Sequence, residues 1–98
     1  MSVISILIDS HAKVTDVVTA VRAVTGGSIS AIQAAVGDES PVYTRELFLN
    51  DFVEVADTLR SLIRSLESSG IAYEIREFEE RIDRDVLMNI LQESENYS

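Results

Sequence analysis

The stretch from Lys13 to Ile32 constrains the fold more than any other part of the chain. Apolar residues recur in it at spacings of three and four, which places them on one face of a helix. They are Val14, Val17, Val18, Val21 and Val24. Gly26 and Gly27 then stop this helix, and the alanine-rich segment from Ser30 to Val36 begins another, with Ser28 or Ser30 as its N-cap and Gly37 at its end. The sequence therefore predicts two consecutive helices joined by a glycine turn.

Three further segments have the composition and alternation of strands. Val3 to Asp9 is rich in β-branched residues and places isoleucines at every second position. A turn from Asp38 to Pro41 leads into a half-exposed strand predicted from Val42 to Leu49. Ile71 to Phe78 alternates apolar and charged side chains, which predicts a third strand with one face inward.

Two amphipathic helices separate and follow these strands. The longer one opens at Asn50 and Asp51, with Asp51 and Glu54 at the spacing of a capping box, and ends at Gly70. Its predicted buried stripe is Val55, Leu59, Leu62, Ile63 and Leu66. The last helix is predicted over about 82–93, ahead of a frayed tail, with the stripe Ile82, Val86, Leu87, Ile90 and Leu91. We expect this stripe to pack on its own domain; otherwise it offers a homodimer interface.

The predicted order is β-α-α-β-α-β followed by an extra C-terminal helix. Helices on one face of a three-stranded antiparallel sheet make an α+β two-layer sandwich. The 98 residues fit a single domain over 1–98, with a core over about 3–77 and the last helix over about 82–93.

Charge and composition exclude several classes of partner. The net charge of −9 argues against binding nucleic acid, which needs clustered Lys and Arg to displace counterions from phosphates. The apolar run from Val3 to Ile8 is too short to span a bilayer and has no basic residue before it. The chain has no cysteine, so we expect a reducing, cytoplasmic location and no membrane association.

No motif in the chain predicts catalysis, a cofactor or a metal. His11 is the only histidine and lies in a predicted loop. A cysteine nucleophile, a Gly-x-Ser-x-Gly elbow and a phosphate-binding glycine loop are all missing. The acidic pairs, such as Asp38 and Glu39, lack the spacing of a calcium loop. We therefore expect a non-enzymatic protein.

The segment KVTDVVTAVRAVTGGSISAI, from Lys13 to Ile32, resembles the first two helices of the C-terminal domain of the bacterial ribosomal stalk protein. The match centres on Ala20-Val21-Arg22 and Thr25-Gly26, and the element order agrees over about 3–77. This resemblance implies a protein-binding domain that contacts a translation factor through the two helices. The resemblance implies that Arg22, Thr25 and Gly26 contact the partner. It implies the same for Thr19 and Gln33, which stand where the family has lysines.

Two other interpretations remain open. Adaptors that deliver substrates to the Clp protease share the same strand and helix order, and Asp9-Ser10-His11 follows the first strand where they hold acidic residues. The acidity also fits an immunity protein or antitoxin that masks a basic toxin or nuclease, with Glu79 and Glu80 among the contacts. A translation factor and a basic toxin are thus the two predicted protein partners.

Overall fold

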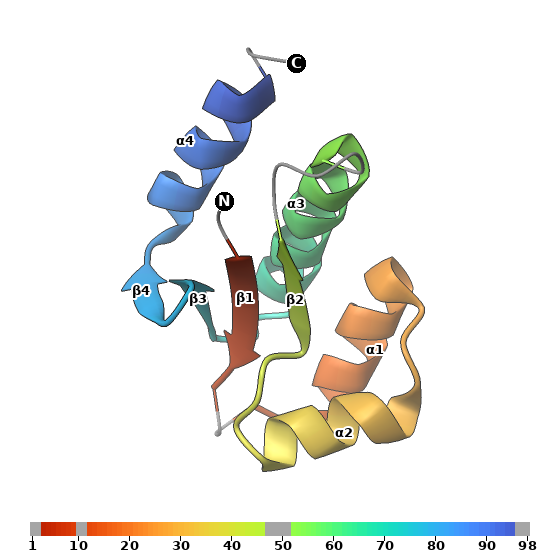
Figure 1. Cartoon of the computed structure of the whole chain (residues 1–98). Helices are drawn as coiled ribbons and strands as arrows, with labels where there is room; N and C mark the ends of the chain where they lie inside the picture. Colours follow the sequence, from red (N-terminus) through yellow and green to blue (C-terminus); the bar gives the residue numbers. More distant parts are fainter. Residues whose placement is uncertain (1–2, 10–11, 47–51, 96–98) are drawn as a thin grey trace.

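The computed structural model describes residues 3–9, 12–46 and 52–95, and these form an α+β fold with four helices and one four-stranded antiparallel sheet (Figure 1). In chain order the elements are β1 (Val3–Ile8), α1 (Val14–Thr25), α2 (Ile29–Gly37), β2 (Tyr43–Glu46), α3 (Phe52–Ser68), β3 (Tyr73–Glu77), β4 (Glu80–Ile82) and α4 (Arg84–Glu95).

The sheet has the strand order β2-β1-β3-β4, with β1 antiparallel to both of its neighbours. β2 and β3 are therefore parallel to each other, and α3 connects them across β1. Successive residues of a strand point to opposite faces. Ile4, Ile6 and Ile8 consequently share one face of β1, while Ser5 and Leu7 point to the other.

A single apolar cluster fills the space between the first of these faces and the helices. Ile4 and Ile6 of β1 are fully buried in it, as are Leu59, Leu62 and Leu66 of α3. Buried residues of α1, α2 and α4 belong to the same cluster. Burial of this apolar surface is the main force that holds the helices on the sheet.

The two predicted N-terminal helices are confirmed. Val17 and Val21 of α1 are fully buried, Val18 and Val24 are partly buried, and Val14 is 38% exposed. α2 has Ser28 as its N-cap, whose Oγ accepts a hydrogen bond from the N–H of Ala31.

The predicted strands and the long helix also occur, with shorter bounds where the structure describes them. β2 covers Tyr43–Glu46, and the rest of the predicted strand, 47–49, lies outside the described residues. The cap predicted at Asp51 lies outside them as well. All five residues of the predicted stripe of α3 are buried, and Gly70 follows its end with a φ of 69°.

The prediction of three strands is wrong, because Glu80–Ile82 forms a fourth strand, β4. It pairs with β3 in a tight hairpin, in which Ile82 lies opposite Ile75. Three residues are too few to show alternation, and the turn at Phe78 and Glu79 lacks the glycine or asparagine typical of such hairpins. Ile82 was therefore expected to lie on the last helix, although it belongs to the sheet.

α4 starts after Asp83, whose Oδ1 accepts a hydrogen bond from the N–H of Val86 at 2.8 Å. Leu87 and Leu91 are fully buried in the common cluster, so this helix packs on its own domain. Val86 is 41% exposed, which corrects its predicted place in the buried stripe. The helix runs to Glu95, so the frayed tail predicted from Glu93 is wrong for its first three residues; 96–98 lie outside the described residues.

None of the described helices is both long and apolar enough to cross a bilayer.

Candidate protein-binding surface

The turn between α1 and α2 is built by three consecutive residues. Gly26 takes a φ of 68°, which glycine adopts without steric cost, and its N–H donates to the carbonyl of Arg22 at 3.0 Å. The Thr25 hydroxyl donates to the carbonyl of Val21 at 3.0 Å and accepts from the N–H of Gly27 at 3.2 Å. Thr25 therefore fixes the turn with its polar group and is only partly exposed.

Arg22 lies on the exposed side of α1, directly beside this turn. Its Nε–H donates to the carbonyl of Gly27 at 3.1 Å, which holds the side chain across the turn. Arg22 makes no ion pair within the described part of the chain. By contrast, Arg76, Arg81 and Arg84 are each paired with a glutamate. The guanidinium of Arg22 thus keeps its terminal N–H groups for an external acceptor.

Arg22 and the exposed uncharged residues of α1, α2 and their turn form a set that we call the α1–α2 surface. Its members are Thr19, Arg22, Ala23, Gly26, Ile29, Ser30, Gln33 and Ala34, all of which are exposed. Ile29 is 47% exposed, a large fraction for an isoleucine. The hydroxyl of Thr19 donates to the carbonyl of Thr15 at 3.0 Å and is tied to its own helix.

The charge distribution distinguishes this surface from the rest of the molecule. Arg22 is the only charged residue between Val17 and Gly37, whereas 26% of the whole chain is charged. Interface cores are depleted of charged residues but enriched in arginine. The α1–α2 surface shares its low charge and its arginine with the cores of protein interfaces. This uncharged run can be seen in the sequence. It includes Ile29, which the resemblance to the stalk domain did not identify as a site residue.

The predicted site residues fall into two separate places. Thr19, Arg22, Thr25, Gly26 and Gln33 lie together on α1, α2 and their turn. Glu79 and Glu80 are exposed on the β3–β4 hairpin. Figure 1 shows that this hairpin lies at the edge of the sheet away from α1 and α2. The two groups cannot form one small contact.

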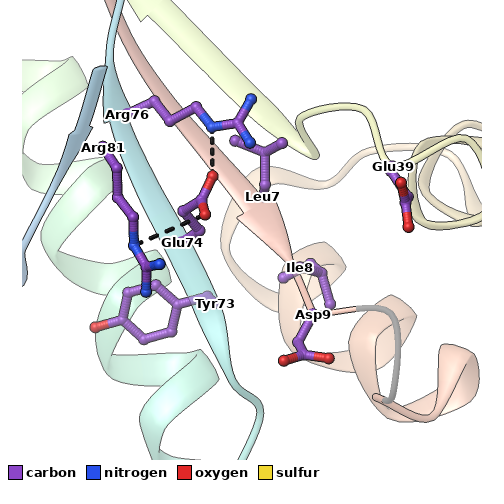
Figure 2. Close-up of a pocket in the computed structure, with 8 residues that line it drawn as sticks. All are labelled: Leu7, Ile8, Asp9, Glu39, Tyr73, Glu74, Arg76 and Arg81. Carbon is purple, nitrogen blue, oxygen red and sulfur yellow. Dashed lines mark hydrogen bonds and ion pairs between the residues drawn. The ribbon is translucent and has the colours of Figure 1, made fainter. Parts of the chain in front are cut away.

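A third group of polar residues lies over the open face of the sheet, in a shallow depression of about 420 Å³. Figure 2 shows Glu74 between Arg76 and Arg81, with Asp9 and Glu39 on the other side of the depression. Nε of Arg76 donates to one oxygen of Glu74, and Nε of Arg81 lies 3.7 Å from the other. Arg76 lies opposite Ser5 and Glu74 opposite Leu7 in the β1–β3 pairing, so these ion pairs join neighbouring strands on this face of the sheet.

Asp9, proposed above as part of an adaptor-like acidic site, lines this depression, while Ser10 and His11 lie outside the described residues. Over the ranges 3–9, 12–46 and 52–95, no three His, Asp or Glu side chains are placed to hold a metal ion.

A larger depression, of about 610 Å³, begins at the α1–α2 turn and runs along β2. Its walls come from the turn, from β2 and from the first turns of α3. The lining residues are Val24, Thr25, Gly27, Pro41, Val42, Tyr43, Thr44, Arg45, Glu54, Val55 and Thr58. We call it the β2 groove.

Comparison of the chain with protein-family models, curated proteins and solved structures found no match.

Proposed function

We propose that this protein is a non-enzymatic protein-binding domain whose α1–α2 surface docks on a partner protein, in the manner of the ribosomal stalk C-terminal domain that it resembles. The partner class is a translation factor, which makes the cytoplasm the site of action. The proposal also carries the finer fold assignment, a stalk-like β-α-α-β-α-β core over about 3–77.

One observation carries the proposal: in a protein of net charge −9, an otherwise uncharged, exposed surface holds one arginine, Arg22, which makes no ion pair with the described residues. Removing uncharged side chains from water costs less free energy than removing charged side chains. An arginine held at the centre of such a surface can form a paired hydrogen bond with a partner carboxylate. Arg22 is therefore the expected hot spot.

The test measures binding of purified translational elongation factors to the immobilised protein. Arg22→Ala should weaken binding at least tenfold, which corresponds to about 1.4 kcal/mol or more. Arg64→Ala is the matched control, because Arg64 is an exposed arginine on α3 and is not a member of the α1–α2 surface. Glu79→Lys with Glu80→Lys should leave binding of the factor intact.

Two results would count against the proposal. The first is that no elongation factor binds the wild-type protein at micromolar concentration. The second is that Arg64→Ala weakens binding as much as Arg22→Ala, since the effect would then report net charge alone. Unfolding by circular dichroism should be measured for each variant, because Arg22 also bonds the turn.

A second candidate function, an inhibitor that masks a basic toxin or nuclease, is supported by the β3–β4 hairpin. Phe78 is 57% exposed at its tip, directly between Glu77 and Glu79. An exposed aromatic among carboxylates suits a basic partner with an apolar pocket. Under this alternative, Glu79→Lys with Glu80→Lys abolishes binding of the partner and Arg22→Ala does not.

A further inference from the structure

β2 is one of the two edge strands of the sheet formed by the described residues, and β1 is its only strand neighbour there. In such a strand, alternate residues direct their backbone N–H and C=O groups away from the sheet. The carbonyl of Thr44 accepts a hydrogen bond from Nη1 of Arg45 at 3.1 Å. A side chain thus supplies a donor to a backbone carbonyl of this edge strand.

The β2 groove lies beside this edge. Val42 to Arg45 form one wall of the groove, and Glu54, Val55 and Thr58 of α3 belong to its lining. In Figure 1, β2 forms the edge of the sheet on the side where α1 and α2 lie. A strand residue adds about 3.3 Å of length, so a segment that pairs along four-residue β2 spans roughly 13 Å. A volume of about 610 Å³ accommodates such a short extended segment.

The charges in the groove define what such a segment must carry. Arg45 is exposed on the β2 side, where its guanidinium lies 5.5 Å from the ring centre of Tyr43. Glu54 is exposed on the α3 side. The remaining lining residues are uncharged. A segment with one carboxylate toward Arg45, and neutral side chains elsewhere, therefore complements the groove.

We propose that β2 binds an extended segment of the partner protein, which adds to the sheet as a fifth strand. The guanidinium of Arg45 releases the carbonyl of Thr44 to a backbone N–H of this segment and pairs with its carboxylate. This inference deepens the proposed function, because the groove includes Thr25 and Gly27 of the same turn that carries the α1–α2 surface. A second copy of this chain is a poorer occupant, since two molecules of net charge −9 repel each other.

The test uses a synthetic hexapeptide, acetylated and amidated, of the sequence Val-Thr-Val-Asp-Val-Thr. Its binding to the full-length ¹⁵N-labelled protein is followed by amide chemical shifts. We expect saturable shifts at Thr44, Arg45 and Gly27. The same peptide with every internal nitrogen methylated cannot donate backbone hydrogen bonds, and its binding should be at least tenfold weaker.

Charge reversal provides the specificity test. Replacing Asp in the peptide by Lys should weaken binding to the wild-type protein. Arg45→Glu should reverse this preference, so that the Lys peptide binds more tightly than the Asp peptide. A variant that merely lost its fold would bind neither peptide, and its amide spectrum would report that directly.

Four outcomes would overturn the inference: no saturable shifts at millimolar peptide, equal binding of the methylated peptide, shifts confined to another surface, or dilution-dependent shifts at Thr44 in the free protein. The last result would show pairing between two copies. Arg64 does not line the groove, so Arg64→Ala should retain peptide binding. Peptide binding without capture of an elongation factor would reject the proposed function alone, and capture without peptide binding would reject the fifth strand alone.

Discussion

At the residue scale, two helix ends adopt the same backbone geometry with different residues. After α3, the N–H of Gly70 donates to the carbonyl of Glu67 and the N–H of Ile71 to that of Leu66. After α2, the N–H of Glu39 donates to the carbonyl of Val36 and that of Ser40 to Ala35. Both are Schellman motifs, in which one residue takes a left-handed conformation. Gly70 has a φ of 69°, and Glu39 has a φ of 57°.

The two motifs predict opposite effects of substitution. Gly70→Ala should destabilise the protein by about 1 kcal/mol, because no atom lies within 4 Å of an added Cβ and the cost is conformational. Glu39→Gly should stabilise it by a similar amount, about 1 kcal/mol after the larger entropy of the unfolded glycine is subtracted. Urea denaturation measures both. Equal signs for the two variants would contradict this account.

The same motif shows the limit of the glycine rule. Gly37 ends α2 as predicted, but the left-handed position after this helix is Glu39. The rule that glycine follows a helix holds at Gly26 and Gly70, where the left-handed residue is a glycine. At Glu39 the hydrogen bonds and packing of the turn hold an unfavourable residue in place, which no local propensity can indicate.

At the scale of elements, one carboxylate connects α3, β3 and α4. The hydroxyl of Tyr73 donates to Oε2 of Glu67 at 2.9 Å, and Nε of Arg84 lies 3.0 Å from the same oxygen. Burial, followed by the hydrogen bond and the charge of Glu67, raises the pKa of Tyr73 from 10.0 to about 12, against a lowering effect of Arg84. The folded protein therefore holds this proton more tightly than the unfolded chain does.

The raised pKa predicts a loss of stability in alkaline solution. Its stabilising contribution is complete below pH 10, the ordinary pKa of tyrosine, and is lost as the pH rises towards about 12. Tyr73→Phe should remove this part of the pH dependence. It should also lower the stability at neutral pH, because the hydrogen bond from Tyr73 to Glu67 is lost. Urea denaturation of both proteins between pH 9 and pH 12 measures the difference. Parallel stability curves would show that Tyr73 does not carry it.

At the scale of the whole molecule, α4 shares the core of the other elements. Leu87 is fully buried in the common cluster, whereas Val86, one residue earlier on the same helix, is 41% exposed. Leu87→Ala should destabilise the whole domain by about 2–5 kcal/mol, while Val86→Ala should cost less than about 0.5 kcal/mol.

Native-state hydrogen exchange distinguishes destabilisation of the whole domain from local unfolding of α4. If α4 belongs to the cooperative core, Leu87→Ala lowers the protection of β1 and α3 amides as much as that of α4 amides. Loss of protection in α4 alone would show that the helix docks as a separate unit. Val86→Ala controls for the change in helix propensity on this helix.

The candidate site was partly open to prediction. Arg22 and Gly26 could be named from the sequence because the helix stripe and the glycine turn are local patterns. The β2 groove could not, since it combines residues near 24–27, 41–45 and 54–58, which only the packed fold brings together. Thr25 could be placed at the turn, but the hydrogen bonds that use its hydroxyl depend on the turn geometry.

The sequence by itself determined the elements with long or regular patterns: β1, both N-terminal helices, α3 and β3. Their periodicity reflects which side chains leave water, and burial of apolar surface is strong enough to dictate that choice locally. Only the tertiary structure decided β4 and the strand order, and with them the exposure of the β2 edge. Three residues of β4 gain their strand conformation from pairing with β3 and from Ile82 lying beside Ile75, and these contacts exist only once the sheet has formed.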